Sequence, residues 1–288
     1  EFRRVLFRSG GVVTGGAPEG GGGGGGSPPA PCGAPVDMSA PVHYVAVSGS
    51  DSSGDGSEAN PWATISHAID EADDGATILV GPGDYVGQVR LDRDFATGVR
   101  VLSEVPYQAR LRHDATVVRS YYGRNIVLEG FDVAHSGPGA GALVIQIQDV
   151  DGDGSASGIT IRNNVLHDSY NNDILKINNG ATHVVVERNV FYNQAGSDEH
   201  IDVNSVDDVI IQDNIFLSDF AGSGRANNND TSAFIVVKDS NGNDDAFLGA
   251  SNVVIRRNVF LHYEGSTGSN FLLLGEDGHP YHEADGVL

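Results

Sequence analysis

Only two of the 17 basic residues in this chain are lysines, Lys176 and Lys238. A lysine differs from an arginine in that burial or crowding can lower its pKa, which lets the amine act as a general base. Further along the chain lie His200, which can donate a proton, and Asp202, whose carboxylate can shift the pKa of Lys176 or serve a hydrolase. A β-elimination beside a carboxylate needs a base, a proton donor and a bound cation. We therefore predict Lys176, His200 and Asp202 as catalytic residues. The alternatives are a surface ion pair between Lys176 and Asp202 and a solvated surface histidine.

Five short apolar segments surround these residues, and we align them as equivalent strands of consecutive repeats. They are Ala142–Ile147, Asn172–Ile177, Asp198–Val203, Ala233–Lys238 and Asn270–Gly275. Because successive side chains of a strand point to opposite faces, Leu175 and Ile177 are expected inside and Lys176 outside. The expected outward columns are Gln146, Lys176, Asp202 and Val236, then Val144, Ile174, His200 and Phe234, and at the strand ends Asn178, Asn204 and Lys238. Polar residues in and around these columns are predicted to bind a substrate, namely Lys238, Asn178, Asn204, Glu199 and Tyr170.

A sequence repeat positions these strands. Each copy has a β-branched segment, two polar residues, an asparagine and two apolar residues, with the asparagines at Asn164, Asn189, Asn214 and Asn258. A period near 25 with short strands and no amphipathic helices predicts one solenoid turn per repeat. The fold class is therefore all-β, and the asparagines are expected to stack in one internal turn. Asn258 follows Asn214 at a longer distance along the chain than separates the other repeat asparagines, which predicts an insertion around residues 219–246.

A short helix is expected to cap the N-terminal end of the solenoid. Asn60 is the predicted N-cap, Pro61 opens the helix, and Ala72 is near its end. One apolar face is expected to cover the first coil, made by Ile65, Ala68, Ile69 and Ala72. A cap is needed because an open solenoid end exposes strand edges.

The two ends of the chain differ from its body. Residues 1–9 resemble a translated sequencing adapter, and residues 10–41 are a disordered Gly/Pro-rich linker by composition. Residues 42–288 are expected to form the β-helix domain. Because Asp285–Leu288 reads as the start of another repeat, we expect that domain to be truncated at its C-terminal end.

Composition excludes several classes of partner. The 39 acidic residues against 17 basic ones give a formal net charge of −22, which argues against nucleic acid or an anionic membrane surface as partner. No apolar run reaches the roughly 18 residues of a transmembrane helix. The single cysteine, Cys32, excludes an internal disulfide framework. We expect a monomeric protein that is secreted or held at the cell surface, without a signal peptide in this fragment.

The repeat and its flanks resemble a known family. The stretch Arg162–Leu166, followed by Asp173–Lys176 and the Asn189 strand, resembles right-handed parallel β-helix proteins of the pectin-lyase-like superfamily, in particular β-helical alginate lyases and chondroitinase-B-like enzymes. The resemblance implies a polysaccharide lyase acting on a uronic-acid-containing glycan, with Lys176 as base. It also implies a Ca²⁺ ion on Asn164, Asn171 and Asp173. The arginine expected one coil later is missing, and His200 stands near its place.

A second possible calcium site and two other functions stay open. Asp149, Asp151 and Asp153 have the spacing that begins a calcium loop, although Thr160 stands where its bidentate acid belongs, so a plain polar turn is the alternative. The carboxylates also allow a glycoside hydrolase, which needs two of them at a defined separation. The third possible function is that of a non-catalytic glycan-binding protein or adhesin.

Overall fold

The computed structural model describes residues 40–151, 154–194, 199–224, 233–239, 249–263, 270–275 and 286–288. Chain contacts divide the sequence into two units, Glu1–Pro35 and Val36–Leu288, and all described residues belong to the second. The predicted adapter and nearly all of the predicted linker therefore lie outside the described residues, as does Cys32. Neither helix of the described part has the length or apolar character to cross a lipid bilayer.

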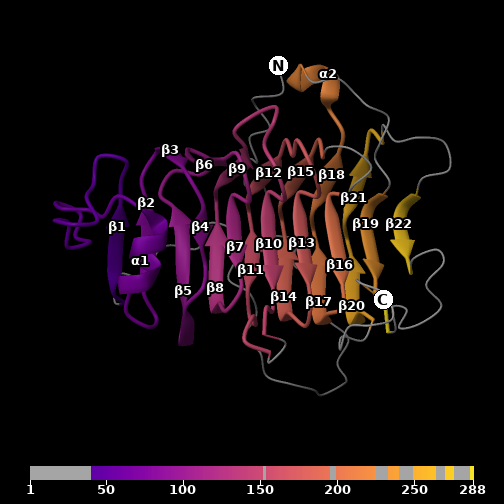
Figure 1. Ribbon diagram of the computed structural model, residues 1–288, viewed down its shortest axis with the longest axis horizontal. Helices are drawn as coiled ribbons and strands as arrows, with labels where there is room; N and C mark the ends of the chain where they lie inside the picture. The colour runs from indigo at the N-terminus through magenta and orange to yellow at the C-terminus, as the bar shows by residue number, and fades with distance from the viewer. Residues whose placement is uncertain are drawn as a thin grey trace, which may run out of the picture. The chain divides into compact units, whose positions relative to one another are not determined.

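Three sheets of parallel strands form a right-handed parallel β-helix, as the repeat and the family resemblance predict (Figure 1). The chain visits the sheets in the order 1, 2, 3 on each coil, so strands of successive coils stack side by side. Sheet 1 contains β1 (Val42–Val45), β2 (Thr77–Val80), β5 (Asp94–Ser103), β8 (Arg124–Glu129), β11 (Thr160–Arg162), β14 (Thr182–Glu187), β17 (Asp207–Gln212) and β20 (Ser251–Arg256).

The other two sheets have seven strands each. Sheet 2 contains β3 (Gly83–Val86), β6 (Ala109–His113), β9 (Asp132–His135), β12 (Val165–His167), β15 (Val190–Tyr192), β18 (Ile215–Leu217) and β21 (Val259–Leu261). Sheet 3 contains β4 (Val89–Arg90), β7 (Val118–Ser120), β10 (Ile145–Gln148), β13 (Leu175–Asn178), β16 (Ile201–Asn204), β19 (Ala233–Lys238) and β22 (Asn270–Leu274).

Apolar side chains from all three sheets fill the interior. Leu128 and Ile161 come from sheet 1, Leu166 and Phe191 from sheet 2, and Ile177 from sheet 3, and all five are fully buried. The register places equivalent residues on neighbouring strands, for example Leu166 beside Phe191. The interior is thus built of stacked columns of like residues.

The helix α1 (Ile65–Glu71) covers the first coil, as expected, with its apolar face buried. The predicted N-cap Asn60 is wrong, because the helix starts later. Thr64 caps it instead, accepting a hydrogen bond from His67 N, and the Asp51 carboxylate holds Thr64 in place. Asn60 closes a turn with Ser57, and Trp62 is bridged to β1, so the segment that contains Asn60 is not helical.

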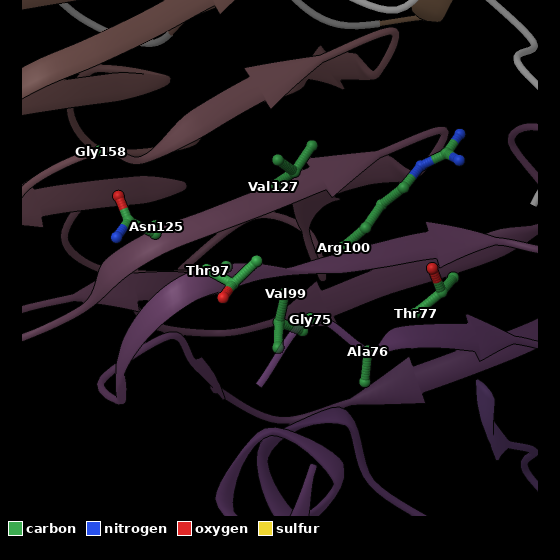
Figure 2. Close-up of a pocket in the computed structure, with 10 residues that line it drawn as sticks. Gly75, Ala76, Thr77, Thr97, Val99, Arg100, Asn125, Val127 and Gly158 are labelled. Carbon is green, nitrogen blue, oxygen red and sulfur yellow. The ribbon is translucent and has the colours of Figure 1, made fainter. Parts of the chain in front are cut away.

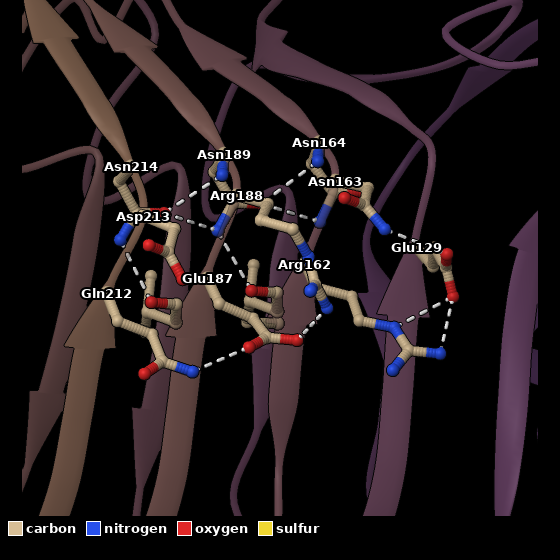
Figure 3. Close-up of polar contacts among 12 residues, drawn as sticks. Glu129, Arg162, Asn163, Asn164, Glu187, Arg188, Asn189, Gln212, Asp213 and Asn214 are labelled. Carbon is tan, nitrogen blue, oxygen red and sulfur yellow. Dashed lines mark hydrogen bonds and ion pairs between the residues drawn. The ribbon is translucent and has the colours of Figure 1, made fainter. Parts of the chain in front are cut away.

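The four repeat asparagines stack at the corner between sheets 1 and 2, as predicted. Figure 3 shows three of them, Asn164, Asn189 and Asn214. Asn189 shows the pattern: its Oδ1 accepts from the backbone N–H of Asn164 at 2.9 Å and from its Nδ2 at 3.2 Å. Its own Nδ2 donates to Ile161 O at 2.9 Å and to Asn214 Oδ1 at 3.1 Å. We call Asn164, Asn189, Asn214 and Asn258 the asparagine ladder.

Each ladder residue follows a residue with left-handed backbone. The φ angles are 54° at Asn163, 56° at Arg188, 57° at Asp213 and 56° at Arg257. This conformation costs a side-chain-bearing residue roughly 1–2 kcal/mol. The two polar positions of the sequence repeat therefore mark the tight corner, and the ladder hydrogen bonds offset its strain.

The predicted insertion region is described in part. The short helix α2 (Phe220–Ser223) begins it and lies outside the three sheets, whereas β19 returns to sheet 3 (Figure 1). Residues 225–232 and 240–248 lie outside the described residues. At the other predicted boundary, Leu288 pairs with β20 through hydrogen bonds to Val253 and Ile255.

Candidate catalytic and metal-binding site

The sheet 3 register confirms the alignment of two of the three expected columns, although only Gln146, Lys176 and Lys238 in them are part-exposed and their other members are buried. Lys176 on β13 lies between Gln146 on β10 and Asp202 on β16, and Asp202 lies beside Val236 on β19. The column at the strand ends contains Asn178, Asn204 and Lys238. Alternation along each strand fixes these positions because the apolar residues between them face the core.

Lys176 and Asp202 form an ion pair, with 2.7 Å between Lys176 Nζ and Asp202 Oδ2. Burial by itself would lower the pKa of Lys176, but the nearby Asp202, Asp173 and Glu199 outweigh it and raise that pKa above its ordinary value. The Lys176 side chain keeps 26% of its surface exposed, whereas Asp202 keeps 4%. Lys176 is therefore the accessible member of the pair.

Three acidic residues, Asp173, Glu199 and Asp202, form a cluster that we call the acidic triad. Each offers a carboxylate oxygen within 4.8 Å of the others, and all three are buried. Glu199 N donates to Asp173 Oδ1 at 2.9 Å. Burial first, and then the charges of Asp202 and Glu199, raise the pKa of Asp173 well above its ordinary value. A positive charge among the three carboxylates would relieve this repulsion.

A shared spacing in the sequence indicates the triad, although the three residues were not predicted to lie together. Asp173 stands three residues before Lys176, and Glu199 stands three residues before Asp202. Because Lys176 and Asp202 are register partners, Asp173 and Glu199 are neighbours at the corner before the strands. Asp173 was predicted as a metal ligand, Glu199 as a substrate contact and Asp202 as a catalytic residue, and the structure brings all three together.

Two amide oxygens lie near the triad without a partner among the described residues. Asn204 Nδ2 donates to Asp202 Oδ1 at 3.1 Å, while Asn204 Oδ1 accepts no hydrogen bond from a described group. Asn178 Oδ1, on the neighbouring strand, is also buried without such a donor. Buried amide oxygens normally accept a hydrogen bond or bind a cation.

The expectation that His200 faces solvent is wrong, as it is for its whole column. Val144, Ile174, His200 and Phe234 are buried in the core. At the corner between sheets 2 and 3 the chain turns, so that two consecutive residues, Ile174 and Leu175, both point inward. The His200 ring stacks on Phe234 with 4.8 Å between ring centroids, and burial lowers its pKa to about 3. This position does not support a role for His200 as proton donor to a substrate.

The predicted calcium ligands Asn164 and Asn171 do not join Asp173. Asn164 belongs to the asparagine ladder, where its Oδ1 accepts from Phe131 N and its Nδ2 donates to Leu128 O. Its amide is thus already engaged at a different corner of the coil. Asn171 is exposed, and its Oδ1 accepts from Ala142 N at 3.2 Å.

The remaining predicted residues lie at separate places. Asp149 is buried and accepts hydrogen bonds from Gly154 N and Ser155 Oγ, as in a polar turn. Asp151 is exposed, and Asp153 lies outside the described residues. Tyr170 is half-buried before β13, and its backbone N–H donates to His135 Nδ1.

A hollow of about 350 Å³ lies on sheet 1 (Figure 2), and Lys176 is not among the residues that line it. Gly98 and Gly158 line it beside Asn125, where a Cβ atom on either glycine would contact Asn125. Arg100 at its edge is held by Glu129 at 2.9 Å. The hollow brings together none of the predicted site residues.

Comparisons with known proteins identify the fold. No family model matches this sequence, and no curated protein matches it. The solved structure of Escherichia coli ybhc is similar over 90% of this chain and 74% of its own, with 12% identity and a TM-score of 0.52. An alginate lyase from Paenibacillus sp. str. FPU-7 covers 68% of this chain and 72% of its own, with 19% identity and a TM-score of 0.44. The pectate lyase Pel9A covers 75% of this chain and 62% of its own, with 17% identity and a TM-score of 0.38. At such identities the likeness is one of fold.

Proposed function

Because the chain has a pectin-lyase-like right-handed parallel β-helix fold, we propose that it is a carbohydrate-active protein, a polysaccharide lyase that cleaves a uronic-acid-containing glycan. The observation that carries this proposal is the placement of Lys176 against the acidic triad on consecutive coils of sheet 3. One part-exposed amine beside three buried carboxylates would supply a base and a cation site within reach of one substrate residue. The names of the lyases with similar folds agree with this assignment.

The residues present fit a calcium ion. Ca²⁺ prefers carboxylate and amide oxygens at about 2.3–2.6 Å, so its ligands lie within roughly 5 Å of one another. Asp173, Glu199 and Asp202 meet that spacing, and Asn204 adds a neighbouring amide oxygen without a described partner. When bound, the ion would neutralise the substrate carboxylate and acidify the adjacent C–H.

Lys176 is the proposed base. Its amine takes the proton from the carbon next to the uronate carboxylate, and the electron pair forms the new double bond while the glycosidic oxygen leaves. The resulting ammonium then donates that proton to the leaving oxygen, since His200 lies in the core. Because Asp202 favours the ammonium form, Lys176 accepts a proton only when the Asp202 charge is engaged elsewhere in the triad.

A hydrolase is the second candidate, and the raised pKa of Asp173 favours it. A carboxyl group whose pKa is raised can act as a general acid. The oxygens of the triad lie within 4.8 Å, nearest to the roughly 5–5.5 Å between carboxyl groups of retaining glycosidases. A retaining mechanism with Asp173 as acid and Asp202 or Glu199 as nucleophile follows from this geometry.

Incubation with alginate, pectate and chondroitin tests both enzyme proposals. A lyase gives an unsaturated product that absorbs in the ultraviolet, a hydrolase gives new reducing ends without that absorbance, and neither signal leaves the glycan-binding reading. Lys176→Arg is expected to abolish the lyase signal, because a guanidinium stays protonated at working pH. Arg110→Lys on sheet 2, in an exposed pair with Asp84, is the matched control and should keep full activity. An active Lys176→Arg enzyme would contradict the lyase proposal.

A further inference from the structure

Polar residues continue on sheet 3 from Lys176 toward the N-terminal coils. Gln146 on β10 is the register partner of both Lys176 and Arg119, the latter on β7, so the three side chains follow one another in a single column. Neighbouring strands are about 4.8 Å apart, which places Arg119 roughly 10 Å from Lys176. One strand spacing is comparable to the length of one sugar unit in a polysaccharide.

These side chains are joined by hydrogen bonds and ring contacts. Tyr121 Oη donates to Gln146 Oε1 at 3.0 Å, and Gln146 Nε2 donates to Gln148 Oε1 at 2.7 Å. The Arg119 guanidinium lies over the Tyr121 ring, 4.4 Å from its centroid. All four are part-exposed. We call Arg119, Tyr121, Gln146 and Gln148 the β7–β10 strip.

Arg119 is fixed on two sides and open on a third. Its Nε donates to Gln88 Oε1 at 2.8 Å, and its Nη2 lies 3.1 Å from Asp92 Oδ2. Within the described residues no hydrogen bond occupies Nη1, and the side chain keeps 20% of its surface exposed. A guanidinium held in this way can donate to a carboxylate at little cost in side-chain entropy.

The same column loses its polar character in the opposite direction. Beyond Asp202 it continues as Val236, which is buried, and then as Leu273 on β22. Neither side chain can donate or accept a hydrogen bond. Within this column of the described residues, donors for sugar hydroxyl and carboxylate groups therefore lie on the N-terminal side of Lys176.

We propose that the β7–β10 strip is a subsite that binds sugar units of an acidic glycan on the N-terminal side of the cleavage point, with Arg119 binding a uronate carboxylate. The two glutamine amides contact hydroxyl groups, and the tyrosine ring supplies a flat apolar surface. This subsite rests on the proposed function for its choice of ligand. It also makes binding asymmetric about Lys176, with more units held on one side than on the other.

Calorimetric titration with saturated oligouronates from alginate, pectate and chondroitin tests the subsite without turnover when it is done on the Lys176→Arg protein. We expect Arg119→Gln to weaken binding of the preferred oligouronate about tenfold, which is about 1.4 kcal/mol. The same oligosaccharide with its carboxyl groups reduced to alcohols should bind both proteins equally. Arg119→Lys keeps the charge and should give an intermediate loss. Arg110→Gln on sheet 2 is the matched control and should change nothing.

Three results would overturn the subsite. They are unchanged affinity in both Arg119 variants, an equal loss for the carboxyl-reduced ligand, and no binding of any oligouronate. Gln148→Ala, at the other end of the strip, should weaken both ligands alike and serves if the Arg119 variants fail to fold. Formation of unsaturated product is measured separately, so the lyase proposal and the subsite can each fail while the other stands.

Discussion

The asparagine ladder and the acidic triad both bury polar side chains in the same β-helix, but they satisfy these groups in different ways. Every ladder amide repeats on the next coil, carries no net charge and both donates and accepts hydrogen bonds. Within the described residues the triad comes from two coils and places three carboxylates together, with Asp202 in an ion pair with Lys176. A buried group that is repeated and satisfied stabilises the coil. Carboxylates that are buried close together and are not repeated along the coil repel one another, and we propose that they bind a cation.

Removing a central ladder residue should give the largest change in stability. Asn189→Leu removes the acceptor of Asn164 N and the amide donor of Ile161 O, and it takes one hydrogen bond from each neighbouring ladder amide in a buried corner. Each unsatisfied group costs about 1–3 kcal/mol, so we expect a loss of roughly 3–5 kcal/mol in urea denaturation. Asn258→Leu, at the half-buried last position, is the matched control and should cost less. Equal losses at both positions would contradict the ladder's role.

Neutralising a carboxylate of the triad should raise the free energy of unfolding, whereas removing a ladder amide should lower it. The pKa of Asp173 is raised in the folded protein. Its contribution to the free energy of unfolding is therefore fully present below pH 3.8, the ordinary pKa, and is lost as pH rises through the raised pKa. Asp173→Asn should therefore stabilise the calcium-free protein near neutral pH by roughly 1–3 kcal/mol. Calcium at about 100 times its Kd should stabilise the wild type by about 2.7 kcal/mol and the variant much less. Thermal unfolding with calcium and with a chelator measures both effects, and equal calcium shifts would contradict the metal site.

His200 sharpens the contrast because it is buried beside the triad without a partner. Neither ring nitrogen has a hydrogen bond within the described residues, and the ring stands in a column with Phe234 and Phe271. His200→Phe should raise stability by roughly 1–2 kcal/mol at neutral pH. The folded pKa of about 3 lies below the ordinary 6.5, so the wild type loses about 1.4 kcal/mol per pH unit as pH falls from 6.5 toward 3. Parallel stability curves for the two proteins would contradict this.

The smallest effect is expected at His167, a buried histidine that is satisfied. Its Nε2 lies 3.0 Å from Asp132 Oδ1 and its Nδ1 2.7 Å from Asp168 Oδ2. Burial lowers its pKa, but the two carboxylates outweigh it, so the pKa is raised above 6.5. The stabilisation is then present below pH 6.5 and lost as pH rises through the raised value. His167→Gln should cost about 1 kcal/mol at pH 6 and less at alkaline pH, the reverse of the trend at His200.

The fold could be predicted because its signals repeat. Four asparagines at equivalent positions and apolar columns between them determine the ladder, the coil and the register of Lys176 with Asp202. The predicted orientation of His200 was wrong because the alternation of side chains does not extend to this residue, which lies just before the strand. At the corner before β16 the backbone turns, and the column there continues as Phe234 and Phe271, which a comparison down the column would have indicated. The predicted start of the helix was wrong for a similar local reason, because Thr64, held by Asp51, caps α1 in place of Asn60.

The spacing of the ladder has a consequence for protein engineering. Asn258 follows Asn214 by 44 residues, whereas Asn214 follows Asn189 by 25, yet both steps have hydrogen bonds of 2.9 and 3.1 Å. Register is therefore kept by the contact between coils and not by the length of chain that separates them. A foreign peptide grafted between β18 and β20, outside the strand β19, should be displayed on the surface without disturbing the stack on either side.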